Sequence, residues 1–525
     1  MAIFDEKRHQ HHRPERQDSS SSASSSESAF VTPMEFEHNQ QCRHHDVPPP
    51  AGGPFDRDPE VGTYGSGSSP SLEKDKKYEG QDLNQNVFSG DGSEGGKSYR
   101  TMGRKSTIIV LITNQIGLGI LSLPKVVQTL GLLPGLITIV GMGILSTYTA
   151  YVLLQFYRRY PSCVNIVDMA YVVGKTPFAT IVGVGLLIKL ALTCASASVT
   201  ISVAFNTISD HGMCTVWFIL FAVLGQWLLC LPRTFKFVSH VGWPSTITML
   251  AAIFIVIISL GIEGPQGAPD GWDKEIKVVG NPDFKTAVSK VCSSAYAWAG
   301  NLAFVTYMAE MKDPTKDFVP SLLVLQVFSL SLYVLIAVAV YCFAGQYTTS
   351  PALGAAPVLP AKIAYGIVLV ALFATGLCFG HTALKFMYVT IMRKLKATSE
   401  ITKNTPKSWI VWVSCATVFW AVSFALGNAI PIFDSILAIS SATFIAWFTF
   451  GLSSILWFHL NWPDKQFLKG WKKIGLTVLN VFIICLAVFM NSAGLYAAIS
   501  DLMEIYDSSK NKIRGPFTCA DNGIF

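Results

Sequence analysis

Long apolar runs fill the chain from Ser106 onward, and short polar stretches separate them. A helix needs about twenty apolar residues to cross a hydrocarbon core about 30 Å thick. By this rule the pattern predicts about eleven membrane-spanning helices, at residues 106–129, 131–156, 178–208, 215–232, 237–262, 286–310, 320–344, 361–392, 408–427, 430–459 and 473–499. The expected fold class is an all-α membrane protein, with a transmembrane domain over residues 101–500.

Composition favours the same class. Half of the 525 residues are apolar and only 14% are charged, whereas an ordinary soluble domain holds roughly a quarter charged residues. A single water-soluble core cannot bury so many apolar side chains. The net charge of +6 is small for this length and spread over many loops, so it gives no sign of nucleic-acid binding.

Two polar tails flank the apolar region. Residues 1–100 are rich in Ser, His, Pro, Gly and Asp, and such a segment cannot bury enough apolar surface to offset its ordering entropy. We expect it to be a disordered cytoplasmic tail. Residues 1–15 lack the apolar segment of a signal peptide, so the first spanning helix is expected to direct membrane insertion.

Basic residues predict the orientation, because Lys and Arg in short loops tend to stay on the cytoplasmic side. With the N-terminus inside, the inner flanks hold Arg104, Lys105, Arg158, Arg159, Lys175, Arg233, Lys236, Lys312, Lys316, Arg393, Lys394, Lys396, Lys403, Lys407, Lys465, Lys469, Lys472 and Lys473. The longest outer segment, residues 263–285, offsets Lys274 and Lys277 with acidic residues. An odd number of spans then places residues 501–525 on the extracytoplasmic side.

Two spans carry residues that interrupt helices. The first span contains the sequence NQIGLGILSLP from Asn114 to Pro124, and the sixth contains AWAGN from Ala297 to Asn301. In lipid, broken helix is tolerated only where it lines a cavity, and a paired break in two halves of a chain points to a transporter site. The spacing of five spans fits two five-helix inverted repeats followed by an eleventh helix. Glycine in membrane helices also serves close helix packing, which remains the alternative at each break.

Such breaks would expose unpaired peptide groups at the middle of the membrane. The N-terminal ends of half-helices present amides and partial positive charge, which suit a carboxylate, and the carbonyls at the other ends suit a cation or an ammonium group. A zwitterionic amino acid fits both. The pattern therefore favours a secondary transporter of small neutral amino acids.

The segment from Asn114 to Pro124 resembles the first-helix signature of the amino acid/auxin permease family, and its GILSLP ending is fairly specific. Residues 106–500 as a whole resemble the fungal neutral amino-acid permeases of that family, and the EMKDP sequence from Glu310 to Pro314 also resembles the family's pattern. The resemblance implies a five-plus-five inverted-repeat fold like that of the bacterial leucine transporter. It further implies import by proton or sodium symport, with the plasma membrane favoured over the vacuolar membrane.

The resemblance also implies a substrate site at the two breaks. The backbone of Ile116 to Gly119 would hold the carboxylate, and Trp298 to Gly300 would face the amino group and the side chain. The expected substrate-binding residues are Asn114, Gln115, Ile116, Gly117, Leu118, Gly119, Trp298, Ala299 and Gly300.

Two ionisable residues lie deep in predicted spans. Lys189 is about eleven residues into the third span, or roughly 16 Å at 1.5 Å per residue, which is too deep to snorkel easily. It is expected to face the bundle interior, either as a proton carrier in the place of a sodium ion or as a fixed structural charge. His381 in span eight is a second candidate carrier, because imidazole titrates near physiological pH, or it is a packed hydrogen-bonding group. The resemblance places Thr375 and Thr382 with His381 in an ion site.

Glu310, Lys312 and Asp313 follow the sixth span. Their charges are expected to form an inner gate or an ion network at the helix end, and a merely solvated interface is the alternative.

The cysteines give no sign of a metal site. Eleven cysteines show no CxxC metal spacing, and we expect neither a metal nor a cofactor. Cys214 and Cys292 fall on the predicted outer side and could form a disulfide, but sequence cannot show that their Cα atoms come close enough.

Two other classes of function fit the sequence less well. A membrane-embedded enzyme would need a catalytic motif such as HExxH or GxSxG, which is absent. A channel fits two broken helices less well than alternating access does.

Overall fold

The computed structural model of the chain describes residues 102–233, 236–269, 271–397, 400, 404–508 and 516–522. All of them belong to one of two compact units, Gly62–Phe525. The predicted disordered tail, residues 1–100, lies outside the described residues, and so does most of the C-terminal tail after residue 508.

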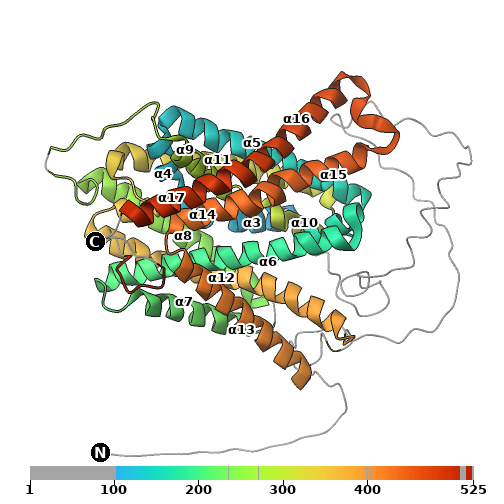
Figure 1. Cartoon of the computed structure of the whole chain (residues 1–525), viewed down its shortest axis with the longest axis horizontal. Coiled ribbons are helices and arrows are strands. Elements are labelled where there is room, and N and C mark those ends of the chain that lie inside the picture. The colour runs from blue at the N-terminus through green and yellow to red at the C-terminus, as the bar shows by residue number, and fades with distance from the viewer. Residues whose placement is uncertain are drawn as a thin grey trace, which may run out of the picture. The chain divides into compact units, whose positions relative to one another are not determined.

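The described residues form a bundle of helices and no strand (Figure 1). The first half of the bundle comprises α3 (Arg104–Gln115), η2 (Leu118–Leu121), α4 (Leu123–Leu130), α5 (Leu132–Arg159), α6 (Ile166–Ser209), α7 (Thr215–Cys230) and α8 (Lys236–Glu263). The second half comprises α9 (Phe284–Tyr296), α10 (Asn301–Glu310), α11 (Pro314–Ala344), η3 (Gly345–Tyr347), η4 (Ala352–Ala355), α12 (Val358–Lys394), α13 (Pro406–Ala429), α14 (Phe433–Ser440), η6 (Ser441–Gly451), α15 (Leu452–Asn461), η7 (Pro463–Leu468), α16 (Gly470–Phe489), η8 (Met490–Gly494) and α17 (Leu495–Ser508). The all-α membrane class is thus confirmed.

The count of eleven spans is not confirmed. Among the described residues, eight helices are long and apolar enough to cross a membrane, and a ninth span results if the bent pair Arg104–Gln115 and Leu118–Leu130 is counted as one. The other two predicted spans correspond to α7, which has 16 residues, and to the pair α9 and α10, which have 13 and 10 residues. Each of these helices is shorter than a full crossing requires.

Polar caps set several helix starts. Asn165 and Asp168 form a reciprocal capping box at the start of α6, and Asp283 accepts from two amides at the start of α9. Such caps satisfy amides that have no partner within the helix. The helix α6 is longer than its predicted span because it begins at Ile166 and contains a kink with non-helical backbone at Gly174 and Lys175.

The two broken helices run in opposite directions through the bundle. The axis bends by 48° between α3 and the η2–α4 segment, and a tight turn over residues 297–300 separates α9 from α10. In Figure 1, α4 lies beside α9, and α3 and α10 lie nearer the centre of the view. The two breaks therefore face each other inside the bundle.

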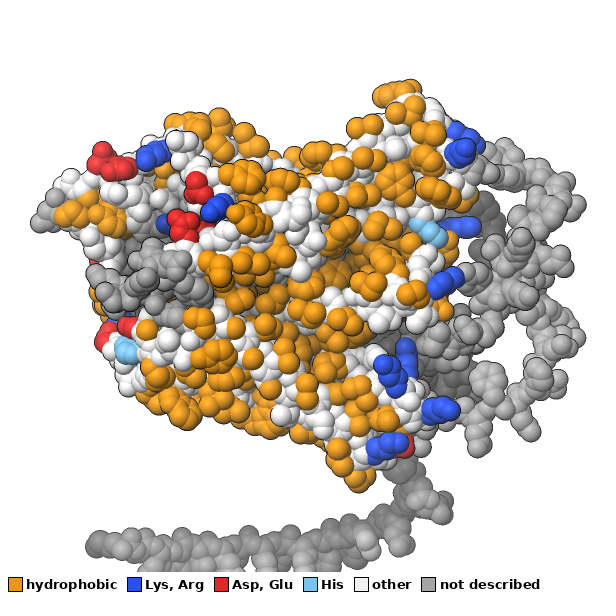
Figure 2. All heavy atoms as spheres, in the orientation of Figure 1, with side chains coloured by type: hydrophobic (Ala, Val, Ile, Leu, Met, Phe, Trp, Pro, Cys, Tyr) orange, Lys and Arg blue, Asp and Glu red, His pale blue; other side chains and the backbone are white. Residues whose placement is uncertain are grey.

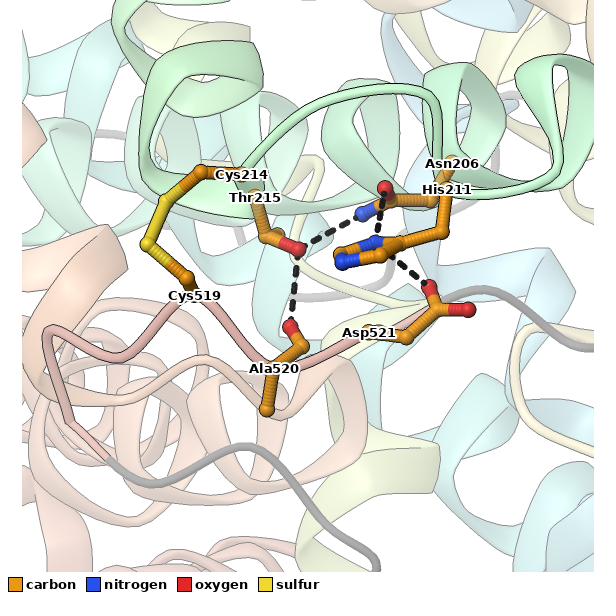
Figure 3. The surroundings of a disulfide bond; sticks show 7 residues. All are labelled: Asn206, His211, Cys214, Thr215, Cys519, Ala520 and Asp521. Carbon is orange, nitrogen blue, oxygen red and sulfur yellow. Dashed lines mark hydrogen bonds and ion pairs between the residues drawn. A yellow bond between two sulfur atoms is a disulfide. The ribbon is translucent and has the colours of Figure 1, made fainter.

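A disulfide joins the short described part of the C-terminal tail to the loop before α7 (Figure 3). Its partners are Cys214 and Cys519, whose Cα atoms are 4.6 Å apart. The possible pairing of Cys214 with Cys292 is therefore wrong. Cys292 is a buried free thiol in α9, and its sulfur lies close to Gly494, at 2.8 Å from where a Cβ would stand.

Hydrogen bonds hold the same tail segment against α6, α7 and α13, the last through the amide of Phe517, which donates to the carbonyl of Asn428 (3.1 Å). Asn522 donates from Nδ2 to Ser202 Oγ (2.9 Å) and accepts from Asn206 Nδ2 (2.5 Å). Thr215 donates from Oγ1 to the carbonyl of Ala520 (2.8 Å; Figure 3). Residues 516–522 are thus fastened to the surface of the bundle, where residues 516–520 remain exposed.

Candidate functional site

A cavity of about 60 Å³ lies where the two breaks face each other. Its wall combines residues of the first break, the second break, α6 and α12. Nine of the residues expected in the site line it, namely Asn114, Gln115, Gly117, Leu118, Gly119, Lys189, Ala299, Gly300 and Thr375. The remaining wall is made by Thr193, Tyr296, Ala297, Leu302, Ala303 and Phe379.

The first break is open and offers donors. The chain is extended at Gly117 (φ −152°, ψ −151°) before the 3-10 turn η2 begins. Gly117 accepts from the amide of Ile120 at 3.3 Å, but the amides of Gly117, Leu118 and Gly119 donate no backbone hydrogen bond within the described chain. These amides are the unpaired donors expected at a helix start. All three residues line the cavity, so the break presents peptide donors to it.

The second break is closed by short-range hydrogen bonds. The amides of Ala297, Trp298 and Ala299 each donate to the carbonyl three residues earlier, at 3.1–3.2 Å. Gly300 also keeps a helical backbone (φ −63°, ψ −26°). The segment is therefore a tightened turn of the 3-10 type, in which the carbonyls that lose their α-helical donors need other partners.

Side chains supply those partners and join the two breaks. Gln115 donates from Nε2 to the carbonyl of Ala297 (3.0 Å), and Asn114 donates from Nδ2 to the carbonyl of Gly300 (3.4 Å). The hydroxyl of Tyr333 in α11 lies 2.9 Å from the carbonyl of Gln115 and 3.0 Å from that of Ala297. The Tyr333 hydroxyl therefore ties one carbonyl from each break together.

Two glycines permit this close approach. A Cβ on Gly119 would lie 2.6 Å from Cα of Ala297, and a Cβ on Gly300 would lie 2.1 Å from Oε1 of Gln115. Real Cβ atoms essentially never approach so closely. A Cβ on Gly117, by contrast, would meet nothing within 4 Å. Gly119 and Gly300 are thus packing positions, whereas Gly117 borders empty space.

Lys189 brings a positive charge to the wall. Its side chain, 3% exposed, places Nζ 4.7 Å from the centre of the Phe379 ring, which is a favourable distance for a cation–π contact. Within the described chain, Nζ has no hydrogen-bond acceptor or ion-pair partner. One turn further along α6, Thr193 accepts from the hydroxyl of Tyr296 (3.1 Å). Lys189 therefore faces the cavity as an ammonium group without a carboxylate.

Two of the expected substrate residues, Ile116 and Trp298, do not line the cavity. Trp298 is fully buried against Tyr333, with ring centroids 5.0 Å apart, and against Gly143, where a Cβ would meet its ring at 2.8 Å. Ser146 donates to the Trp298 carbonyl (3.2 Å). Ile116 is also buried and lies outside the lining. Trp298 thus holds the second break in place, and Ile116 belongs to the hydrophobic core.

The candidate ion-site residues of α12 separate into two locations. Thr375 lines the cavity. His381 lies elsewhere, where its Nε2 donates to the carbonyl of Pro232 (3.1 Å) and its ring lies 5.4 Å from that of Trp412. Thr382 is exposed and donates to the carbonyl of Cys378 (2.7 Å). The structure therefore does not bring His381 and Thr382 together with Thr375 at the break.

The candidate gate residues form a corner between α10 and α11. The backbone of Met102 pairs with both sides of this corner, accepting from Lys312 (3.0 Å) and donating to Glu310 (3.1 Å). Asp313 caps α11 by accepting from the amide of Lys316 (3.1 Å). The ion pair in this region joins Arg104 to Asp317 (2.8 Å). The start of the first broken helix is thus fastened to the end of the second.

Thr193, Tyr296 and Phe379 escaped the sequence analysis. They lie on uninterrupted helical sequence. Only the direction in which each side chain projects from its helix would separate them from neighbouring residues. A helix that is apolar on all sides gives no sequence pattern from which this direction can be predicted. The described residues contain no group of three or more His, Cys, Asp or Glu side chains that could hold a metal ion.

Comparison with known proteins agrees with this geometry. Residues 100–499 match the family model described as transmembrane amino acid transporter protein. The chain is 30% identical over 442 residues to the N amino acid transport system protein of Neurospora crassa, covering 82% of this chain and 91% of that protein. It is 27% identical to a transmembrane transporter of Fusarium pseudograminearum, covering 89% and 95%. It is also 24% identical to the amino acid transporter AVT1H of Arabidopsis thaliana, covering 74% and 88%. The chain belongs to the family of transmembrane amino acid transporter proteins.

Proposed function

We propose that the protein is a secondary active transporter that imports neutral amino acids by cation symport through alternating access. The single observation that carries the proposal is the cavity between two oppositely directed broken helices, with unpaired amides at the first break and the unpartnered Oε1 of Gln115 against Gly300 of the second. Discontinuous helices at the middle of a bundle are the usual construction of a transporter site.

The substrate carboxylate would bind at the first break. The amides of Gly117, Leu118 and Gly119 have no backbone acceptor in the described chain and belong to residues that line the cavity. The η2 segment begins at this wall with its positive dipole end. For the substrate ammonium, Gln115 offers Oε1, a buried acceptor without a hydrogen-bond partner in the described chain. Asn114 lies beside it in the wall. Donors and acceptor together match a zwitterion.

Charge and size support a small neutral substrate. No acidic residue is among those that line the cavity, and Lys189 contributes a positive charge. A cationic side chain would therefore meet repulsion without a partner. One water molecule needs roughly 10–15 Å³ of such space, so the cavity of about 60 Å³ holds the equivalent of a few water molecules.

Lys189 is the proposed coupling residue. The alternative coupling ion, sodium, would be repelled by a charged lysine, whereas a lysine in the wall of a cavity is able to release and regain a proton during the transport cycle. In the described chain no carboxylate neutralises its ammonium. We therefore favour proton over sodium as the coupling cation, and place the ion-coupling role on Lys189 and Thr375 rather than on His381 and Thr382.

The proposed orientation has the N-terminus in the cytoplasm and the C-terminal tail outside. Figure 2 shows Lys and Arg side chains with almost no Asp or Glu at one end of the bundle, and Asp and Glu mixed with a few Lys or Arg at the other, which agrees with the positive-inside rule. The disulfide Cys214–Cys519 joins the C-terminal tail to the loop before α7, and disulfides persist in oxidising compartments. Both observations support an extracytoplasmic tail, and the resemblance to fungal permeases favours the plasma membrane.

Uptake by the purified chain in sealed proteoliposomes tests the proposal. Radiolabelled alanine should accumulate above its outside concentration when the outside is acidic, with or without sodium, and accumulation should collapse when an ionophore removes the proton gradient. Competition by neutral but not by cationic amino acids should accompany it. Passive equilibration would instead indicate a channel, and chemical conversion of the alanine would indicate an enzyme.

A matched pair of variants tests the coupling role. Lys189→Ala should lose accumulation driven by the proton gradient but keep exchange of internal for external alanine, since exchange needs no net proton movement. His381→Ala is the control, because its ring lies away from the cavity. Full gradient-driven accumulation by Lys189→Ala would remove this lysine from the coupling mechanism.

A further inference from the structure

A second, larger hollow lies between α5, α15 and α16. Its volume is about 250 Å³, and its wall includes Tyr148, Tyr151, Gln155, Trp457, Asn461 and Lys473. None of these residues lines the cavity between the breaks. We refer to this hollow as the α5–α16 groove.

The α5–α16 groove lies close to the basic end of the bundle. Gln155 is four residues before Arg159, the last residue of α5, or roughly 6 Å at 1.5 Å per residue. Asn461 ends α15, and Lys473 lies in the first turn of α16. Figure 2 shows basic side chains at this end, where α15 turns into α16. The end of the groove formed by Gln155, Asn461 and Lys473 is therefore near the depth of lipid headgroups.

Neighbouring aromatic residues support that depth. Trp462 and Trp471 lie on either side of η7 and are 69% and 81% exposed. Tryptophan in this position is typical of the boundary between membrane and water. The helix α16 is also peripheral. In the span Gly470–Glu504, only 22% of the most apolar stretch is buried inside the bundle, the lowest share among the candidate spans of the described residues. The groove thus borders the surrounding lipid.

The chemistry of the groove suits an anion. Its charged member is Lys473, whose Nζ donates to the neutral Asn461 Oδ1 at 3.0 Å. No carboxylate is among the lining residues, and no described carboxylate pairs with this ammonium. Tyr148 accepts from Asn480 Nδ2 (2.5 Å), which leaves its hydroxyl proton to donate. Tyr151 and Gln155 add further donors. A lysine with several neutral donors is a typical phosphate site.

We propose that the α5–α16 groove binds the phosphate headgroup of an anionic phospholipid from the adjacent leaflet. Free phosphate shares this chemistry, but the groove also presents Leu460 and Leu476 beside its polar residues, and apolar contacts of that kind suit the acyl chains of a lipid. The headgroup contacts Lys473, and the lipid fills the space between α5 and α16. Lipid binding in this groove is independent of substrate binding at the two breaks, because no residue lines both sites.

Native mass spectrometry of the delipidated full chain tests the site. The protein in detergent is titrated with phosphatidylserine and, separately, with phosphatidylcholine, and bound copies are counted. The unmodified chain should bind phosphatidylserine more tightly. Lys473→Ala should weaken that binding roughly fivefold, which corresponds to about 1 kcal/mol for one basic residue near a lipid headgroup. Lys473→Arg should retain it.

The matched control is Lys472→Ala. Lys472 is exposed and lies 5.9 Å from the ring of Trp471 rather than in the groove, so its loss should leave tight binding unchanged. Equal losses in the two variants, or no preference for phosphatidylserine, would overturn the proposal in favour of general surface charge. A third arm adds inorganic phosphate. If it displaces phosphatidylserine at millimolar concentration, the site takes a small anion and the lipid assignment fails.

Discussion

The two helix breaks occupy corresponding places but have different structures. The first break contains an extended residue, Gly117, and amides without backbone partners. The second break keeps helical backbone angles, and its amides are used within the turn. Its carbonyls are satisfied by Gln115, Tyr333 and Ser146. Hydrogen-bonding capacity for a ligand therefore lies mainly on the first break.

This difference indicates that the two breaks have different roles in the site. The first break presents donors, and the second break presents a firm wall against which those donors are aligned. Gly119 marks the point of contact, because its Cα faces the backbone of Ala297. If this description is right, substitutions at the contact should be severe, and substitutions facing the empty space should act through substrate size.

The largest effect is expected for Gly119→Val. A Cβ would lie 2.6 Å from Cα of Ala297, and backbone atoms cannot move aside as a side chain can. Overpacking of this kind costs about 3 kcal/mol, which corresponds to a loss of transport of roughly a hundredfold or more. Initial uptake rates normalised to the amount of inserted protein measure it. Uptake near the unmodified rate would show that the two breaks do not need this contact.

Tyr333→Phe should have the next largest effect. Removal of the hydroxyl leaves the buried carbonyl of Gln115 without its donor, while that of Ala297 keeps Gln115 Nε2. An unsatisfied buried group costs about 1–3 kcal/mol. We expect a lower melting temperature in detergent and weaker substrate binding. Unchanged melting would mean that the Gln115 carbonyl finds another donor and that the bridge is dispensable.

Gly300→Ala should disturb the hydrogen bond from Gln115 to the carbonyl of Ala297. The new methyl group would lie 2.1 Å from Gln115 Oε1, so the side chain of Gln115 has to turn and lose its bond to Ala297. A lost hydrogen bond of this type costs about 1 kcal/mol, or roughly fivefold in substrate affinity. A competition assay measures the affinity. Combining the change with Gln115→Ala should add little, since both remove the same bond.

The smallest effect is expected for Gly117→Ala. The methyl group meets nothing within 4 Å, and the extended backbone of Gly117 is open to alanine. Glycine and alanine uptake should therefore change by less than about threefold, a difference below 1 kcal/mol, whereas uptake of a bulkier substrate such as leucine should fall further. An equal loss for all substrates would place the methyl group against the carboxylate position instead.

Apolar run length predicted most of the helices, because the requirement to cross lipid fixes both length and composition. The two breaks were also predictable, since Gly117, Gly119 and Gly300 stand in apolar surroundings. The number of crossings was not. The short helix α7 and the divided pair of α9 and α10 fall below the length at which hydropathy alone decides.

The residues around the cavity were predicted only in part, because their positions depend on helix rotation. Trp298 is adjacent to the lining residue Ala299, yet its side chain faces α5 and α11. Thr375 and His381 lie on one helix but reach different surroundings. The cysteine pairing likewise depended on the path of residues 516–522, which no local sequence pattern reveals.

The disulfide between Cys214 and Cys519 closes a covalent ring across 305 residues of the chain. Any single cut between these two cysteines, for example in the segment between α8 and α9, leaves both fragments attached to each other. A protease acting there should produce no change in apparent mass on a gel run without thiol reagent. Two separate fragments should appear once that reagent is added, so the ring gives the folded chain a simple electrophoretic signature.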